Sequence, residues 1–112
     1  MKEIGDRFNQ GKLKWSLVDF DAFEEMVKVL EFGCKKYDAN NWKKGLKTTE
    51  VLESMQRHIN AILRGEDIDP ESGLNHYGHI QCNAMFLGYM FKYMKETMDN
   101  RFKDINKINL NN

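Results

Sequence analysis

The sequence predicts an all-α fold, a small bundle of three main helices, and three observations support this class. Proline occurs once in 112 residues, at Pro70, so long helices can run without interruption. Apolar residues recur at the helical period over three long stretches, and no stretch of useful length shows the alternating pattern of a strand. A chain of this length is expected to form one domain, here 1–112 with its core over about 8–98.

The first helix is predicted over roughly Asp19 to Tyr37. Apolar residues recur there every three or four positions, at Phe20, Phe23, Val27, Leu30 and Cys34. Charged residues at similar spacing occupy the other side of this helix. The next segment, Asp38 to Leu46, contains two asparagines, a glycine and a tryptophan. It is therefore predicted to be a loop that holds one large aromatic side chain.

The second helix is predicted to begin at Thr48 or Thr49, because either hydroxyl can cap the first turn. It is predicted to stop at Gly65, since glycine is the commonest residue just after a helix end. His58 falls on the apolar stripe of this helix, so its side chain is expected to point inward.

The third helix is predicted to open at Asp69-Pro70, with the aspartate as its cap, although Gly73 delays the regular part to about Leu74. Its long apolar content makes it the longest helix and the centre of the core. The tail, Asp99 to Asn112, has few apolar residues, so a short fourth helix, a dimer contact and a frayed end all remain open. Seven methionines and the apolar third helix suggest surface enough for a partner, and the oligomeric state stays open.

Composition excludes several classes of protein. Lysine plus arginine and aspartate plus glutamate are both 17, so the chain lacks the net positive charge that supplies most nucleic-acid affinity. Cys34 and Cys82 stand alone and are expected to be reduced thiols. No apolar run is long enough to span a membrane, and the first residues do not resemble a signal peptide. We expect a cytoplasmic protein.

All three histidines lie between positions 58 and 79, which is the strongest functional signal in the sequence. His76, His79 and Asn83 are expected to share one face of the third helix, with His58 approaching from the second. Such a group can bind a divalent ion or can simply form hydrogen bonds within the core. Nearby carboxylates favour the metal site, and they are Glu50, Glu53, Glu66 and Asp69. Glu53 can instead form a surface ion pair with Arg57.

A second group of polar and aromatic residues ends the first helix and continues into the loop. It contains Lys36, Tyr37, Asn41 and Trp42. Together these offer a flat face for stacking, an amide for a base or sugar edge and a positive charge for phosphate. The alternative is that Trp42 fills the end of the bundle while the lysines are solvated.

Several short motifs follow one another along the chain. They are Gly11-Lys12, Gly33-x-x-Lys36-Tyr37, Asn41-Trp42, Arg57-His58, Gly65-Glu66-x-x-Asp69-x-Glu71-Ser72-Gly73 and His76-x-x-His79. Over roughly Phe8 to Leu87 the set resembles the dATP/dGTP diphosphohydrolase family of phages and bacteria, which is similar to the MazG-like all-α nucleoside triphosphate pyrophosphohydrolases. The resemblance implies a helical bundle, assembled as a dimer or larger, that removes pyrophosphate from a purine deoxynucleoside triphosphate. It therefore also implies a homodimer or homotetramer, located in the host cytoplasm if a phage encodes the chain.

One departure from the wider MazG-like pattern concerns the metal. Those enzymes bind magnesium through two acidic motifs, whereas here His76-x-x-His79 stands at the second and only Glu50-x-x-Glu53 remains of the first. The resemblance implies a divalent ion, Mg²⁺ or Mn²⁺, and the histidines also suit Co²⁺ or Zn²⁺.

The resemblance and the chemistry of the side chains together suggest roles for individual residues. The candidate metal ligands are His58, Asp69, His76, His79 and Glu53. The candidate catalytic groups are Glu53, His58 and Glu66. The candidate substrate contacts are Lys12, Lys36 and Arg57 for phosphates, Tyr37 or Trp42 for base stacking, and Asn41 and Asn83 for polar edges. Two other classes stay open: a nucleotide-binding protein that does not catalyse, and a structural helical adaptor.

Overall fold

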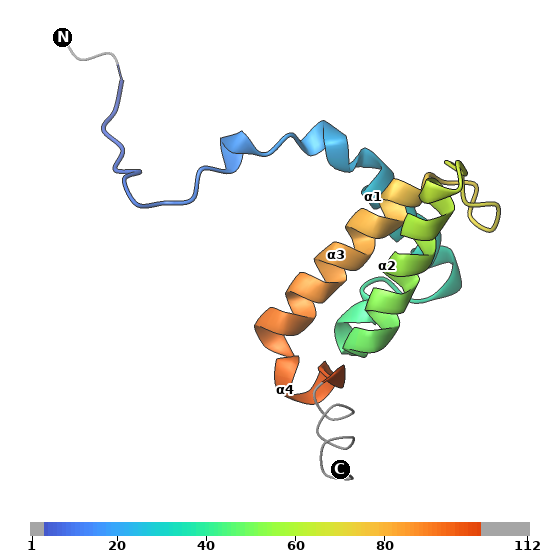
Figure 1. Ribbon diagram of the computed structural model, residues 1–112. Coiled ribbons are helices and arrows are strands. Elements are labelled where there is room, and N and C mark those ends of the chain that lie inside the picture. Colours follow the sequence, from blue (N-terminus) through green and yellow to red (C-terminus); the bar gives the residue numbers. More distant parts are fainter. Residues whose placement is uncertain (1–3, 102–112) are drawn as a thin grey trace.

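A computed structural model describes residues 4–101 and folds them into an extended N-terminal segment followed by a helical bundle (Figure 1). The main helices are α1 (Glu24–Lys36), α2 (Thr48–Leu63) and α3 (His76–Tyr93), and the short α4 (Lys95–Met98) follows. Three 3-10 turns precede or separate them: η1 (Trp15–Leu17), η2 (Phe20–Phe23) and η3 (Asn41–Lys44). Across 4–101 no strand forms, and the extended pairing is limited to one bridge between Ile68 and Asn75. The all-α prediction with three main helices is confirmed.

α3 is the central helix of the bundle because it packs against both α1 and α2. Its contact with α1 is close: a Cβ added at Gly78 would lie 2.9 Å from the backbone of Glu25. Near the same level Gln81 Nε2 donates to the carbonyl oxygen of Ala22 at 2.9 Å. Further along, Met90 is fully buried, with 0% of its surface exposed. The prediction that the third helix is the longest and forms the core is confirmed.

The first helix is shorter than its sequence pattern predicted. The segment expected to be one helix from Asp19 is split into η2 and α1. Asp19 accepts a hydrogen bond from the backbone N–H of Asp21 at 3.0 Å and so closes a tight turn at the start of η2. The regular α-helix therefore begins only at Glu24.

α2 has the predicted extent but a different N-terminal cap. Neither Thr48 nor Thr49 accepts a capping hydrogen bond, and Thr48 is completely buried. Instead, the backbone N–H of Thr49 donates to Asn100 Oδ1 at 3.1 Å, and Asn100 Nδ2 donates to Thr49 Oγ1 at 2.8 Å. The first turn of α2 is thus capped by a residue that follows α4.

The C-terminal end of α2 forms a Schellman motif. The N–H of Gly65 donates to Ile62 O, and the N–H of Glu66 donates to Ala61 O, each at 2.9 Å. Gly65 has a positive φ of 89°, which a glycine adopts without strain. The prediction that α2 stops at Gly65 is confirmed, and the motif fixes the backbone of Glu66.

α3 begins later than predicted, at His76, and Asp69 does not cap it. Residues 70–73 form a turn in which Gly73, at a φ of 73°, donates its N–H to Asp69 O at 2.8 Å. The chain then runs back beside itself, because Asp69 N donates to Leu74 O and His76 N donates to Asp67 O. Pro70 therefore lies in a reversal before the helix and not at its first position.

The N-terminal arm, defined here as residues 4–18, extends away from the bundle (Figure 1). At the other end, the alternatives for the tail lie mostly outside the described residues, which end at Arg101. The short fourth helix was predicted within 99–112, whereas α4 ends at Met98 and is therefore a different element. None of the helices in the described part has the length and apolar character needed to cross a membrane.

Candidate functional site

The three histidines converge where α2 ends and α3 begins. His58 Nδ1 and His76 Nδ1 are 2.8 Å apart across the contact between the two helices. The rings of His58 and His79 are stacked, with centroids 4.4 Å apart and planes 4° from parallel. The expected grouping, a pair on one face of α3 and a third ring from α2, is therefore what the structure contains.

Each histidine of α3 also meets a carboxylate from the loop between α2 and α3. His76 Nε2 lies 2.7 Å from Glu66 Oε1, and His79 Nε2 lies 3.3 Å from Asp69 Oδ2. The Schellman motif positions Glu66, and the reversal at residues 69–74 positions Asp69. The folding of this short loop thus aligns both carboxylates with the ring nitrogens.

Ser72 forms hydrogen bonds with both members of the pair between His79 and Asp69. Its hydroxyl donates to Asp69 Oδ2 at 2.9 Å and lies 2.8 Å from His79 Nε2. Because a hydroxyl has one hydrogen, the ring nitrogen must be the donor in the second contact. His79 in its neutral form is therefore protonated at Nε2, which leaves the lone pair on Nδ1.

Burial and charge set the protonation of the cluster. Burial lowers the pKa of His58, and the neighbouring His79 and His76 lower it further. Burial also lowers the pKa of His79 and outweighs Asp69, which acts in the opposite direction. Burial alone would raise the pKa of Asp69, but hydrogen bonds from Ser72 and from the N–H of Glu71 bring it below its usual value. Neutral imidazoles beside ionised carboxylates are the state that metal coordination requires.

The donor set of the cluster suits a divalent ion, since imidazoles backed by carboxylates recur in metal sites. Across residues 4–101, however, no three His, Cys, Asp or Glu side chains already stand in a coordinating arrangement. The nitrogens of His58 and His76 instead share a hydrogen bond. The chemistry of the donors fits a metal, and its binding stays a prediction.

A cavity of about 1060 Å³ extends from this cluster towards the loop after α1. Ten of the predicted site residues line it: Lys36, Tyr37, Asn41, Trp42, Arg57, His58, Glu66, Asp69, His76 and His79. The two groups seen separately in the sequence, the histidines and the lysine–tryptophan segment, therefore border one space. Its volume is slightly above the usual range of small-molecule sites, about 300–1,000 Å³.

Trp42 forms the aromatic part of the cavity wall. Its ring packs on Phe86 with centroids 4.8 Å apart and meets Tyr89 edge-on at 4.9 Å. Lys43 Nζ lies 5.5 Å from the Trp42 ring centroid. These contacts hold the indole against α3, so the two interpretations of Trp42, packing and lining a site, are both compatible with its position.

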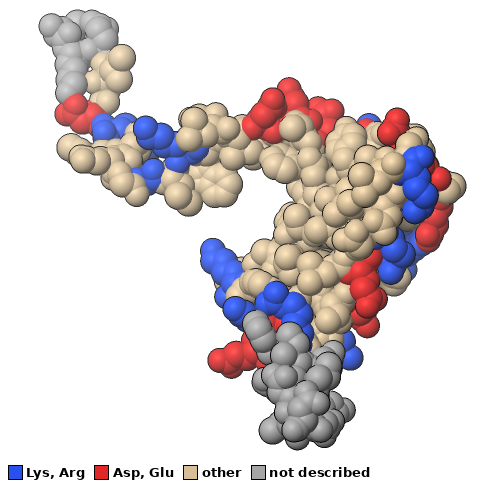
Figure 2. Space-filling model, viewed as in Figure 1, with Lys and Arg blue, Asp and Glu red and all other residues tan. Residues whose placement is uncertain are grey.

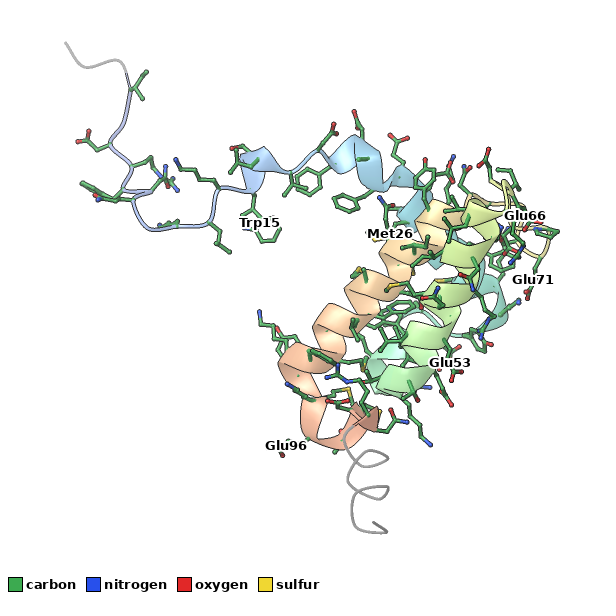
Figure 3. All side chains as sticks on the ribbon, in the orientation of Figure 1. Trp15, Met26, Glu53, Glu66, Glu71 and Glu96 are labelled. Carbon is green, nitrogen blue, oxygen red and sulfur yellow. The ribbon has the colours of Figure 1, made fainter. Side chains whose placement is uncertain are left out.

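Three predicted residues lie elsewhere. Lys12 is exposed on the N-terminal arm, and Glu53 is exposed on α2, where its side chain is separate from Glu66 and Glu71 (Figure 3). Asn83 donates from Nδ2 to Ser54 Oγ at 3.2 Å and to His79 O at 3.0 Å, so its amide group ties α3 to α2. None of the three lines the cavity, and the roles expected for them stay predictions.

The structure also brings residues to the site that the sequence interpretation left without a role. Arg64 lines the cavity because it follows Arg57 by two helical turns and shares its face of α2. Phe86 follows His79 by the same interval on α3 and lines the cavity as well. Ser72 had a local signal, since a serine three residues after an aspartate is typical of a capped turn.

Comparison with known proteins gives two matches. Residues 2–101 match the family described as "dATP/dGTP diphosphohydrolase, N-terminal". The dATP/dGTP diphosphohydrolase of Salmonella phage PMBT28 is 35% identical over 98 residues, which are 88% of this chain and 33% of the phage protein. The chain thus spans about a third of the length of that relative. No solved structure matches the chain.

Proposed function

The chain belongs to the dATP/dGTP diphosphohydrolase N-terminal family, and on this premise we propose that it hydrolyses dATP or dGTP to the monophosphate and pyrophosphate. The observation that best supports the proposal is that one cavity is lined by both the histidine–carboxylate cluster and Trp42. A nucleotide needs both surfaces, because its base is flat and largely apolar while its phosphates are anionic.

The basic side chains on the cavity wall suit the triphosphate. Arg57 lines it from α2, Arg64 from the residue directly after α2, and Lys36 from α1. A guanidinium group forms paired hydrogen bonds with phosphate oxygens, whereas an ammonium group acts as a point charge. We propose that these three residues bind the phosphates and offset the charge that develops on the leaving pyrophosphate.

The aromatic end of the cavity suits the purine. Trp42 is held in place by Phe86 and Tyr89, so a base that stacks on it meets a surface that is already ordered. Asn41, next along the wall, has both a donor and an acceptor for a base or sugar edge. Tyr37 also lines the cavity and offers another ring on which a base could stack.

We expect His76 and His79 to hold a divalent ion through Nδ1, the nitrogen that keeps its lone pair, while Asp69 orients His79 from the Nε2 side. The ion is Mg²⁺ or Mn²⁺, with Co²⁺ or Zn²⁺ as alternatives that suit imidazole. Bound there, the ion would lower the pKa of a water molecule. Glu66 and Ser72 keep the rings of His76 and His79 oriented through the hydrogen bonds already described.

His58 is the proposed general base. An ion bound at His76 Nδ1 would break the hydrogen bond from His58, whose lone pair stays on Nε2. Burial lowers the pKa of His58, which keeps the ring neutral near pH 7. Its Nε2 would accept the proton of the water that attacks the α-phosphorus, and pyrophosphate would leave. Glu53 has no part in this proposal because it is exposed outside the cavity.

The test is an assay of the purified chain with all eight common nucleoside triphosphates, each with Mg²⁺, Mn²⁺ or Co²⁺. We expect pyrophosphate and monophosphate from dATP and dGTP. Replacement of His79 by alanine should abolish this release while the helical circular dichroism signal remains. If no nucleotide releases pyrophosphate under any condition, the enzymatic proposal is wrong. If bound nucleotide is recovered intact after the protein is denatured, the chain is a nucleotide-binding protein instead.

A further inference from the structure

The N-terminal arm exposes large apolar side chains that contact no core. Phe8 is 86% exposed, Leu13 81% and Trp15 65%. Figure 3 shows Trp15 on the arm, well away from the bundle. Soluble proteins rarely leave so many large apolar groups together in water, and where they do, the groups mark an interaction site.

The bundle also exposes large apolar side chains of its own, at the end where α2 stops and α3 begins. We call this group the receiving surface; its exposed members are Ile62, Leu63, Ile68 and Tyr77. Backbone hydrogen bonds hold this end together, since His76 N donates to Asp67 O and Ile68 pairs with Asn75. The surface is therefore ordered before anything covers it.

The charges of the two surfaces are complementary. The arm carries three basic residues, Arg7, Lys12 and Lys14, and one acidic residue, Asp6. Figure 2 shows basic side chains gathered along the arm. The loop beside the receiving surface carries one basic residue, Arg64, and four acidic ones: Glu66, Asp67, Asp69 and Glu71. Glu71 already pairs with Lys36 of α1 at 3.1 Å, and the other three keep the loop acidic. A positive apolar segment thus has a negative apolar counterpart on the same chain.

We propose that the arm of one chain docks on the receiving surface of a second copy, so that two copies exchange arms. The available area supports this arrangement. Phe8 and Trp15 each offer about 150–250 Å². With two arms and the two surfaces they cover, the buried area reaches the roughly 1,200 Å² of the smallest stable interfaces.

The turn at the base of the arm favours exchange over folding back onto the same chain. Asp19 accepts from the N–H of Asp21, and Val18 is extended, with φ −87° and ψ 129°. This turn directs the arm away from its own bundle (Figure 1). An arm so directed reaches a neighbour without a change in the fold, which is the geometry of segment exchange between identical chains.

Exchange also gives Lys12 a path to a cavity, and this consequence rests on the proposed function. Lys12 does not line the cavity of its own chain. Glu66, in the loop beside the receiving surface, also lines that cavity. A docked arm therefore brings Lys12 near the partner's phosphate site.

Cysteine cross-linking tests the docking without any assay of activity. In a Cys34→Ser background, chains carrying Leu13→Cys are mixed with tagged chains carrying Leu63→Cys and oxidised. We expect a mixed disulfide between the two kinds of chain. The control pairs Leu13→Cys with Tyr93→Cys, because Tyr93 is 64% exposed but lies at the C-terminal end of α3. That pair should give little product.

Two results would overturn the proposal. One is a mixed disulfide no more abundant with Leu63→Cys than with Tyr93→Cys. The other is a disulfide within single chains when Leu13→Cys and Leu63→Cys are combined in one chain, which would mean that the arm folds back. Sedimentation gives a second measure: Leu13→Asp with Trp15→Asp should weaken self-association at least about tenfold. Self-association unchanged by these substitutions would also contradict exchange.

Complementation tests the consequence for Lys12. Chains with Lys12→Ala and chains with His79→Ala should each be inactive or weak. When equal amounts are mixed and refolded, about half of the dimers contain one chain of each kind. In such a dimer one of the two sites has both wild-type Lys12 and wild-type His79, so about a quarter of wild-type activity should return. No recovery, with cross-linking still positive, would show that the arm docks without completing the site. An inactive wild type would count against the proposed function alone.

Discussion

His58 and His76 approach each other through the same type of ring nitrogen, Nδ1 to Nδ1, at 2.8 Å. When both rings are neutral, one nitrogen of this pair must carry a hydrogen and the other must accept it. Glu66 determines which of the two Nδ1 atoms carries the hydrogen. Its carboxylate accepts a hydrogen bond from His76 Nε2 at 2.7 Å, so the lone pair of His76 is on Nδ1. The carboxylate of the loop thereby sets the tautomer of a histidine on another helix.

We therefore predict the tautomers of all three histidines at a pH where they are neutral. His58 should carry its hydrogen on Nδ1, and His76 and His79 on Nε2. Nitrogen-15 NMR that correlates ring nitrogens with ring protons reads this pattern directly. Replacement of Glu66 by alanine should remove the bias at His76 and His58 while His79 keeps its tautomer. A wild-type His58 protonated at Nε2 would contradict the proposal that Glu66 sets the tautomers of His76 and His58.

Glu66→Gln should lower both metal affinity and activity by about 10–100-fold, because an amide oxygen orients and polarises a ligating imidazole less than a carboxylate does. The matched control is Glu96→Gln, which makes the same change on exposed α4, at the opposite end of the bundle (Figure 3). Calorimetric titration with Mn²⁺ and turnover of dGTP supply the two measurements. Equal effects of the two substitutions would exclude a local role for Glu66.

Two glycines of α3 should respond to alanine in opposite directions. At Gly78 the new Cβ would lie 2.9 Å from the backbone of Glu25, so α1 must move and about 1–3 kcal/mol of stability should be lost. At Gly88 nothing lies within 4 Å, so alanine should stabilise the helix by roughly 0.5–1 kcal/mol. Urea unfolding of both variants measures the difference. Similar values would mean that α1 and α3 are not in close backbone contact.

Asn100→Ala should destabilise the fold by about 0.5–2 kcal/mol, the usual cost of a lost helix cap, because Thr49 N–H loses its acceptor. Asn100→Asp keeps an acceptor and places a negative charge at the N-terminus of α2, so it should retain most of the stability. Thermal unfolding of the two variants separates capping from simple loss of a side chain. Equal losses would argue against the cap.

The two thiols should differ sharply in reactivity. Cys34 is exposed, whereas burial raises the pKa of Cys82 to about 12. At pH 8 only about one Cys82 side chain in 10⁴ is then a thiolate, the form that reacts. Iodoacetamide should modify one thiol in the native chain and both in urea, as counted by mass spectrometry. Rapid modification of Cys82 without denaturant would mean that the end of the core near the site opens easily.

Periodicity was sufficient to predict three main helices and the meeting of the histidines, but not where the first and third helices begin. A spacing of three residues aligns His76 with His79 on any helix, so that part of the site needed no tertiary information. The position of His58 followed from the apolar stripe of α2. These features repeat regularly along the chain, and regular patterns can be recognised without a structure.

The features that sequence could not supply depend on how the chain reverses direction. Asp69-Pro70 has the composition of a helix start, yet the hydrogen bond from Gly73 to Asp69 turns it into a loop. Thr49 has the composition of a cap, yet Asn100, 51 positions away, performs that role. Lys12 and Glu53 had suitable chemistry, but local patterns do not show which way an arm leaves a bundle or which side of α2 borders a cavity.

The Schellman end of α2 has a consequence for the order in which the molecule folds. His58 and His76 are 18 positions apart and are joined by a short, hydrogen-bonded loop, whereas the cap between Thr49 and Asn100 must close a loop of 51 positions. Shorter loops lose less entropy on closing, so the end with the histidines should assemble early and open last. Hydrogen exchange should therefore be slower at the amide of Glu66 than at that of Thr49, so the end with the histidines stays intact while the far end of the same helix frays.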